Sequence, residues 1–388
     1  MRIRGAVLAL AVLTAIASTA STAAAPDAAS CRGDWTPRPG RRVEVRNIDE
    51  LERAARGARS RDTILLADGD YPLRQMIDIA ASDVVLRGKS GDRDRVVLHG
   101  RGMKGDPVGV AVSVSASDVA VADLTIRDVG YHAVQVRGER DVARFVLHNA
   151  RLLDTGQQLL KVSTSDGHYA DAGLVACSDF SYTESAPSDY TNGVDVLAGK
   201  DWVIRDNHFA RIRGPVAGRW SAGPTILVWL AAQNTLVERN VIVDSFRGIA
   251  LGLDPGPALV RRGGEREFDH IGGIVRNNVI VNLNPWADEA IEANAAKDAL
   301  IEHNSVLVEG TIPWSIAARF PIASATVRYN LTNRTIYRRN GGRIEESGNV
   351  TGAKADWFVN AAAGDLHLSD LGGAAASGAG AFEPSGAK

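Results

Sequence analysis

The chain has 388 residues, of which 45% are apolar and 23% are charged, and its formal net charge at pH 7 is -2. This length allows one large core or two domains. The balanced charge gives no electrostatic case for nucleic acid as a partner, because nucleic-acid-binding proteins cluster an excess of Lys and Arg. No boundary between two domains is visible, so we expect a single domain and a monomer.

Residues 1–25 are typical of a secretory signal peptide, because two arginines precede an apolar run that ends in small residues. No other segment approaches the ~18 apolar residues of a membrane span, so we expect no membrane association. The protein should therefore be secreted or periplasmic, with residues 26–42 as an N-terminal extension. After export, Cys31 and Cys177 could form one disulfide; a buried free Cys177 is the alternative.

Residues 43–74 predict a strand, a helix and a second strand. The apolar residues of the helix recur at the spacing of one helix face, at Leu51, Ala54, Ala55 and Ala58. Asn47 is a suitable N-cap, and Glu50 follows three residues later, as in a capping box. We expect this helix to cover one end of the domain, where an open sheet edge would expose backbone groups.

From about residue 76, short strands alternate Val, Ile and Leu with polar residues, so one face of each strand is buried. Six later strands are followed by segments that end in Asn, at Asn207, Asn240, Asn278, Asn304, Asn330 and Asn349. Their intervals of 19 to 38 residues fit single turns of a parallel β-helix, in which the Asn amides would stack as a ladder. The predicted fold class is therefore all-β, a right-handed parallel β-helix solenoid over residues 43–350 with an N-terminal capping α-helix.

The bends and the end of the solenoid can also be predicted. Asp or Asn often begins the second strand of a turn, where such a side chain can bond nearby backbone in a sharp bend. These residues are Asp118, Asp141, Asp201, Asn234 and Asp298. Residues 351–388 are rich in Gly and Ala, and we expect them to hold a last strand, Asp365–Leu368, and a flexible end.

Equal positions in successive turns of a stacked fold lie above each other, ~4.8 Å apart. We predict as inward pairs Val134/Val136, Leu160/Val162, Val194/Val196, Leu227/Trp229, Ile249/Leu251, Ile291/Ala293 and Ile316/Ala318. The residue between each pair then belongs to an outward column: Gln135, Lys161, Asp195, Val228, Ala250, Glu292 and Ala317. Lys161 should stack on Asp195, with Arg137 one turn earlier and within reach. Glu292 should lie roughly 14 Å from Asp195, farther than the about 5 to 9.5 Å between the paired carboxylates of an ordinary glycosidase.

Lys161 is the first candidate catalytic residue. A Lys beside another cation, such as Arg137, loses its proton more readily and can act as a general base, although Asp195 opposes this effect. The alternative is an exposed ion pair of Lys161 and Asp195, which contributes only about 0 to 1 kcal/mol. Asp195 and Glu292 could instead help to bind Ca²⁺ through their oxygens, without a calcium-loop signature. No zinc-type cluster or other catalytic motif is visible.

Aromatic residues precede several inward strands and form a second group of candidates. They are Tyr131, Tyr190, Trp286 and Trp314. They could line one flank of a groove, because flat aromatic faces suit pyranose rings; plain packing within loops is the alternative. Further residues near the same face are Arg247, Asp189, Asn192, Glu289 and Asp254.

The segment IDELERAARGARSRDTILLADGDYPL resembles the N-terminal cap of right-handed parallel β-helix polysaccharide lyases, particularly the sixth family, which contains alginate lyases and chondroitinase B. The family's order of a helix, a GDTI-type strand and a DGTY-type turn recurs here, with RDTI at 61–64 and DGDY at 68–71. The rest of the chain is similar to secreted right-handed β-helix repeat proteins. The resemblance implies a Lys base, an Arg acid and a carboxylate-bound Ca²⁺, and Lys161 in QQLLKVS matches the base.

The sequence therefore favours a secreted lyase that cleaves a uronate-containing polysaccharide by β-elimination. Lys161 would remove the proton next to the carboxylate, Arg137 or Arg247 would offset the carboxylate charge, and Tyr190 would protonate the leaving oxygen. Asp195 would orient Lys161, and the expected sugar-binding residues are Asp195, Asn192, Glu292, Tyr131, Trp286 and Trp314, with Glu292 able to bind metal instead. Two alternatives are a glycoside hydrolase with loop carboxylates such as Asp189, Asp195 or Asp254, and a non-catalytic glycan-binding surface protein.

Overall fold

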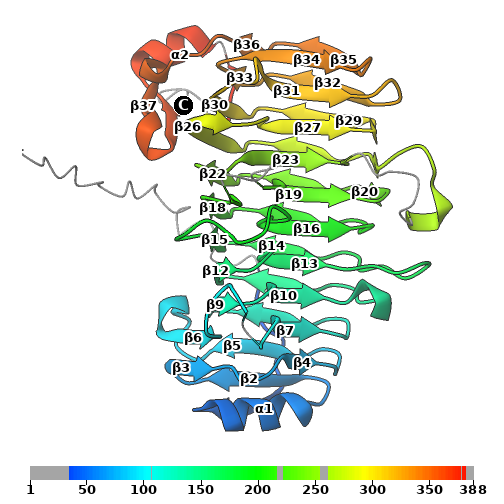
Figure 1. The fold of residues 1–388 in the computed structure, drawn as a ribbon, viewed down its shortest axis with the longest axis vertical. Helices are drawn as coiled ribbons and strands as arrows, with labels where there is room; N and C mark the ends of the chain where they lie inside the picture. Colours follow the sequence, from blue (N-terminus) through cyan, green and yellow to red (C-terminus); the bar gives the residue numbers. More distant parts are fainter. Residues whose placement is uncertain (1–34, 106, 216–221, 254–260, 377, 382–388) are drawn as a thin grey trace, which may run out of the picture.

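The computed structural model describes residues 35–105, 107–215, 222–253, 261–376 and 378–381, and its strands stack into a parallel β-helix (Figure 1). Successive coils add one strand to each of three long sheets, whose neighbouring strands are parallel. The β-helix predicted from the Asn repeat is thereby confirmed. The predicted signal peptide, Cys31 and Asp254 lie outside the described residues.

The three long sheets of the described chain contain twelve, ten and eleven strands. The twelve-stranded sheet consists of β1 (Arg41–Val45), β2 (Asp62–Leu66), β5 (Val85–Gly88), β8 (Ala120–Ala122), β11 (Val146–His148), β14 (Leu174–Ala176), β17 (Val203–Arg205), β21 (Leu236–Glu238), β25 (Ile274–Arg276), β29 (Ala299–Glu302), β32 (Ser324–Arg328) and β35 (Arg343–Ser347). The ten-stranded sheet consists of β4 (Ile77–Ile79), β7 (Val110–Val114), β10 (His132–Val136), β13 (Leu160–Val162), β16 (Val194–Leu197), β19 (Pro224–Trp229), β23 (Arg247–Leu251), β27 (Ile291–Asn294), β31 (Trp314–Arg319) and β34 (Thr335–Arg339). The eleven-stranded sheet consists of β3 (Gly69–Pro72), β6 (Val96–His99), β9 (Thr125–Val129), β12 (Arg151–Thr155), β15 (Asp179–Ser181), β18 (His208–Ala210), β22 (Val241–Val243), β26 (Val279–Ala287), β30 (Ser305–Gly310), β33 (Leu331–Thr332) and β36 (Val350–Thr351). A small parallel sheet adds β20 (Ala232–Gln233), β24 (His270–Ile271) and β28 (Ala296–Lys297).

The Asn repeat forms the predicted ladder inside the solenoid. The amide nitrogen of each Asn donates to the amide oxygen of the next, over 2.9–3.0 Å, through Asn207, Asn240, Asn278, Asn304, Asn330 and Asn349. Each amide also donates to a backbone carbonyl, as Asn278 does to Val237. Because an unpaired buried amide is costly, these paired side chains hold successive coils in one register.

The predicted bends adopt the left-handed conformation. Asp118, Asp141, Asp201, Asn234 and Asp298 have φ between 53° and 60°. Asp and Asn tolerate this conformation better than other residues with a side chain. The Asp and Asn residues therefore mark a corner of the coil, as predicted.

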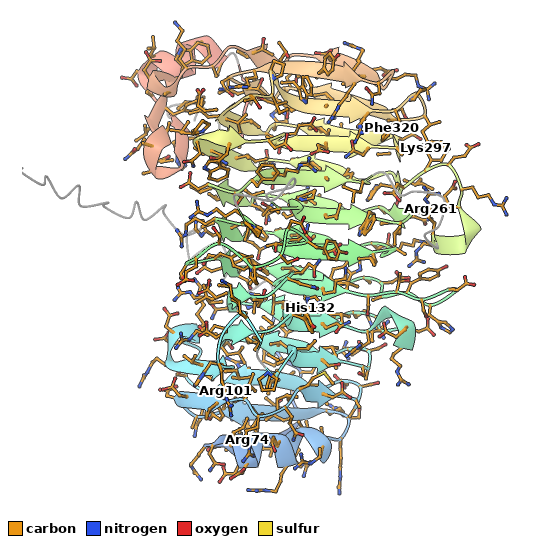
Figure 2. All side chains as sticks on the ribbon, in the orientation of Figure 1. Arg74, Arg101, His132, Arg261, Lys297 and Phe320 are labelled. Carbon is orange, nitrogen blue, oxygen red and sulfur yellow. The ribbon has the colours of Figure 1, made fainter. Side chains whose placement is uncertain are left out.

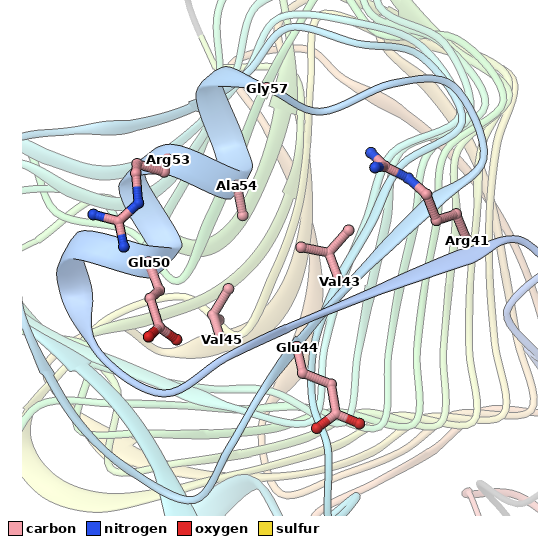
Figure 3. Close-up of a pocket in the computed structure, with 8 residues that line it drawn as sticks. All are labelled: Arg41, Val43, Glu44, Val45, Glu50, Arg53, Ala54 and Gly57. Atoms are coloured by element: carbon pink, nitrogen blue, oxygen red, sulfur yellow. The ribbon is translucent and has the colours of Figure 1, made fainter.

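Helix α1 (Ile48–Arg56) lies at the N-terminal end of the stack and contacts β1, β2 and β4 (Figure 1). Asn47 caps it by accepting from the backbone N–H of Glu50 over 3.0 Å, as predicted. Leu51 and Ala55 are buried in the main core. Residues of α1 and β1 line a cavity of about 330 Å³ at this end, among them Val43, Glu50 and Ala54 (Figure 3).

The C-terminal segment, expected to hold a last strand and a flexible end, is largely regular within the described residues. It contains the predicted strand β38 (Asp365–Leu368), which pairs with the antiparallel β37 (Phe358–Asn360), and a helix α2 (Asp370–Ala376). Phe358 and Leu366 are buried in a cluster with Leu307 and Leu331 of the eleven-stranded sheet. The few large apolar residues of this Gly/Ala-rich segment therefore dock it on the side of the solenoid (Figure 1).

Two further expectations concern the cysteines and membranes. Cys177 is disulfide-bonded and is not a free buried thiol. Within the described residues, no helix is both long and apolar enough to cross a bilayer.

Candidate functional site

The outward column of the ten-stranded sheet crosses all ten strands. Its members are Asp78, Ser113, Gln135, Lys161, Asp195, Leu227, Ala250, Glu292, Ala317 and Tyr337. Lys161 is paired with Asp195 across β13 and β16, as predicted. Two apolar positions, Leu227 and Ala250, therefore separate Asp195 from Glu292 along this column.

The predicted register was wrong in one strand, β19. We expected Leu227 and Trp229 to point inward and Val228 outward, but Asp195 is paired with Leu227. Val228 lies in the main core, whereas Leu227, Trp229 and Ala250 form a separate apolar cluster outside the coil. The stretch ILVWL is apolar throughout, so alternation cannot decide which set of side chains points inward.

The polar cluster consists of Lys161, Tyr190, Asp195 and Trp229. Lys161 Nζ donates to Asp195 Oδ2 over 2.5 Å and to the Tyr190 hydroxyl over 2.7 Å. The Tyr190 hydroxyl donates to the same carboxylate oxygen over 3.0 Å, and Trp229 Nε1 donates to Asp195 Oδ1 over 2.9 Å. Asp195 is fully buried and Lys161 is 9% exposed, whereas Tyr190 is 40% exposed. Tyr190 therefore links a buried ion pair to the surface.

Two titratable groups of this cluster are strongly affected by their surroundings. Burial, and then the Asp195 charge, raise the pKa of Tyr190 well above its usual range, so its hydroxyl stays protonated at neutral pH. His132 lies on β10, one coil before Lys161 (Figure 2). Burial lowers the pKa of His132 to about 4, so its ring is neutral beside Lys161.

A cavity of about 470 Å³ opens next to Tyr190. It is lined by Asp189, Tyr190, Asn192, Ala222, Gly223, Pro224, Leu227, Arg247, Leu253, Glu292, Asn294, Arg319 and Arg339. Its size is that of a small-molecule site, and it combines apolar walls with a few polar groups. Three arginines and one end of the polar cluster therefore share one cavity.

Two buried amides in this cavity lack a complete set of partners. Asn192 donates to the Pro224 carbonyl over 2.6 Å, and Asn294 donates to Glu292 Oε2 over 2.6 Å. Both side chains are at most 1% exposed, and their amide oxygens have no hydrogen-bond partner among the described residues. A buried acceptor without a donor is unfavourable, and both oxygens are themselves buried, so these two amides make the cavity wall locally unfavourable.

Arg247 and Glu292 lie on neighbouring strands at the cavity wall. Arg247 Nε donates to Asp288 Oδ2 over 2.6 Å and lies 3.9 Å from Glu292 Oε1. The guanidinium is thus held by two carboxylates from the β26–β27 connection and β27. These two carboxylates fix the position of the Arg247 guanidinium, and Arg247 still lines the cavity.

Glu289 lies behind Arg339, which lines the cavity. Its Oε1 accepts from Trp314 Nε1 over 2.7 Å and from the Arg339 guanidinium. Burial, and then the nearby Glu292 charge, raise the pKa of Glu289 to about 8, so its carboxyl group is protonated at neutral pH. From the sequence we placed Glu289 near this face and predicted no role for it.

Arg319 and Arg339 line the cavity but were not predicted from the sequence. Both extend one column, since Asn294 pairs with Arg319 and Arg319 pairs with Arg339. This column lies two residues after the outward one. The register predicted at Glu292 and Ala317 also fixes the positions two residues later on each strand. Following this second column along the sheet leads to both arginines.

Six of the ten predicted site residues do not line the cavity. Lys161 and Asp195 contact Tyr190, and Trp314 lies beside Arg339, so these three adjoin it, whereas the other three lie apart from it. Arg137 donates to Ser113 over 3.2 Å and pairs with Glu139 at 3.3 Å. Tyr131 is 54% exposed beside His132, and Trp286 lies under the Arg213 guanidinium. None of the three lines the cavity. Arg137 therefore has nearer partners than Lys161, contrary to the expected contact.

The carboxylates do not fit a Ca²⁺ site. Both oxygens of Asp195 accept from Lys161, Tyr190 or Trp229, and Glu292 accepts from Asn294. Calcium requires six to eight oxygen ligands around one point, and Asp195 and Glu292 lie three strands apart. In the described part of the chain, no group of three or more His, Cys, Asp or Glu side chains could hold a metal ion.

The raised pKa of Glu289 predicts a pH dependence of stability. Between its ordinary value of 4.5 and about 8, the carboxyl group is protonated in the folded chain and ionised in the unfolded one. Folding then takes up a proton, so this contribution to stability is lost as pH rises from about 4.5 to about 8. Glu289→Gln should remove that loss in urea unfolding across this range. Glu309→Gln, at a side chain that is 55% exposed, should leave the wild-type pH profile unchanged, and identical profiles for all three proteins would contradict the prediction.

The sequence matches no protein-family model and no curated protein. Among solved structures, the chain is similar to the pectate lyase Pel9A, with 12% identity over 89% of this chain and 97% of that chain and a TM-score of 0.57. It is also similar to a rhamnogalacturonan lyase, with 11% identity over 83% and 92% of the two chains and a TM-score of 0.55. These identities are low, so the likeness shows a shared parallel β-helix fold.

Proposed function

We propose that the protein cleaves a uronate-containing polysaccharide by β-elimination in the cavity beside Tyr190. One observation carries the proposal: three arginines, Arg247, Arg319 and Arg339, line a single cavity next to Tyr190. An acidic sugar matches this lining, because its carboxylate can pair with guanidinium groups. A neutral apolar ligand would make no use of the three guanidinium groups.

The contacts of Lys161 and Tyr190 suit the two proton transfers of this reaction. In its neutral form, Lys161 would take the proton next to the uronate carboxylate, and the electron pair would form a carbon–carbon double bond as the glycosidic bond breaks. Tyr190, which stays protonated, would supply the proton to the leaving oxygen. The 2.7 Å contact then lets the Lys161 ammonium return a proton to Tyr190 and restore both groups.

Asp195 and Arg247 would support these steps without exchanging protons. Asp195 accepts from both Lys161 and Tyr190, so it would hold the base and the acid on the same side of the sugar. Arg247 would offset the negative charge that grows on the carboxylate as the proton leaves. We assign this role to Arg247 over Arg137, because Arg247 lines the cavity. Secretion through residues 1–25 and a monomeric state belong to the same proposal.

A glycoside hydrolase is the second candidate. The observation that favours it is Glu289, whose carboxyl group is protonated at neutral pH and therefore suited to protonate a leaving oxygen. Its burial behind Trp314 and Arg339 makes this role less favourable than that of Tyr190, which opens to the cavity.

A substrate screen tests the proposal. The full chain is incubated with alginate, pectate, chondroitin, heparin and neutral glycans, with and without a chelator. New reducing ends accompanied by ultraviolet absorbance of a conjugated double bond support elimination. Reducing ends without that absorbance indicate a hydrolase, and binding without any product indicates a glycan-binding protein.

A further inference from the structure

Two stacked aromatic rings lie beside the cavity, on the last two strands of the ten-stranded sheet. Trp314 on β31 and Tyr337 on β34 have ring centroids 4.5 Å apart and an angle of 18° between their planes. Tyr337 belongs to the outward column, two strands beyond Glu292. We infer that this pair forms a separate subsite that binds one sugar ring of a longer polysaccharide by stacking, toward the C-terminal end of the cavity. The inference extends the proposed function.

The aromatic pair is held in place from behind. Trp314 Nε1 donates to Glu289 over 2.7 Å, and Glu289 is only 2% exposed. The Arg339 guanidinium binds the same carboxyl oxygen and lies 5.6 Å from the Trp314 ring. Trp314 is thus fixed by a hydrogen bond to a buried carboxyl group, and Tyr337 stacks on this fixed ring. The pair therefore loses little freedom when a ligand binds, which distinguishes it from ordinary exposed aromatics.

The exposed surface of the pair is on Tyr337. Trp314 covers one ring face of Tyr337, yet 44% of the Tyr337 side chain surface remains exposed. Aromatic faces provide a large apolar contact with a polar edge, which matches the alternation of C–H and hydroxyl groups on a pyranose ring. Trp314 was predicted from the sequence as a sugar-binding residue, whereas Tyr337 was not.

Arg339 connects the subsite to the cavity. It contacts Glu289 together with Trp314, and it also lines the cavity with Arg247. Tyr337 lies about two strand spacings from Glu292, or ~10 Å along the solenoid axis. A chain with one acidic sugar in the cavity would therefore reach Tyr337 only if it runs along the axis, over the faces of successive strands.

Oligosaccharide length provides the test. Binding of oligogalacturonides and oligoalginates, from the disaccharide to the hexasaccharide, is measured by calorimetry with the full chain and with Tyr337→Ala. We expect wild-type affinity to rise with length, and Tyr337→Ala to lower hexasaccharide affinity by about tenfold with little effect on the disaccharide. The matched control is Tyr329→Ala, because Tyr329 is 42% exposed and stacks on His303 at 5.1 Å, outside the ten-stranded sheet.

The same series run with neutral oligosaccharides distinguishes the two proposals, because stacking on Tyr337 does not depend on a carboxylate. A loss confined to long ligands, of either charge, in Tyr337→Ala but not in Tyr329→Ala supports the subsite. If only neutral ligands show that loss, the subsite stands and the uronate preference fails. If wild-type and Tyr337→Ala proteins bind every length equally, or neither binds any of them, the subsite is rejected.

Discussion

The Tyr190→Phe variant should show a kcat on its acidic polysaccharide about 10²- to 10⁴-fold below that of the wild type, the usual contribution of a positioned general acid. The substitution removes only the hydroxyl that lies between Lys161 and the cavity. Because Tyr190 is 40% exposed and Asp195 keeps its contacts with Lys161 and Trp229, the fold should be retained. Initial rates of double-bond absorbance measure the effect.

Variants of Lys161, the proposed base, extend this experiment. If Lys161 and Tyr190 exchange one proton, Lys161→Met should be at least as damaging as Tyr190→Phe, and the double variant should be little worse than Lys161→Met. Lys161→Met also leaves Asp195 buried without its cation, so its unfolding must be followed in parallel. Tyr329→Phe serves as the control for loss of a phenolic hydroxyl. Full turnover by Tyr190→Phe would falsify the assignment of the acid.

The Asn278→Ala variant should lose on the order of 3 kcal/mol or more of unfolding free energy, because it leaves several buried groups without partners. The Asn278 oxygen accepts from both the backbone and the side chain of Asn240, and its amide donates to Val237 and Asn304. Asn278 is fully buried, so water cannot replace these contacts. Urea unfolding followed by circular dichroism measures the loss.

The last member of the same ladder is the matched comparison. Asn349 accepts from Asn330 and donates to Val327, but it is only partly buried at the end of the stack. Water can reach its partners after truncation, so Asn349→Ala should cost clearly less than Asn278→Ala. Equal losses for the two variants would mean that the ladder does not stabilise the interior as described.

The architecture of the solenoid could be predicted because each coil repeats the same local chemistry. The Asn positions, the Asp and Asn bends and the stacking of Lys161 on Asp195 all follow from one period. The register of β19 could not be predicted, because Leu227 and Val228 are equally apolar and only tertiary packing distinguishes their two faces. The docking of the C-terminal segment through Leu366 was hidden by its Gly/Ala-rich composition.

The candidate site was predictable only where it lies on regular strands. Lys161, Asp195 and Glu292 were placed in one column by counting residues from inward pairs. Tyr190 meets this column through a connection whose path no periodic pattern specifies, and the partners of Arg137 depend on side-chain length and competing acceptors. Burial also decides the protonation of Glu289, which composition alone does not indicate.

The left-handed corners at residues such as Asp201 and Asn234 have a consequence for how this scaffold can change. Each corner bends the chain at a single left-handed residue, so the turn into the next strand is set locally. Insertions between coils can then remodel the rim around the cavity while the stacked registers stay intact. Loop grafting beside the ten-stranded sheet should therefore be a practical route to new sugar specificities on this chain.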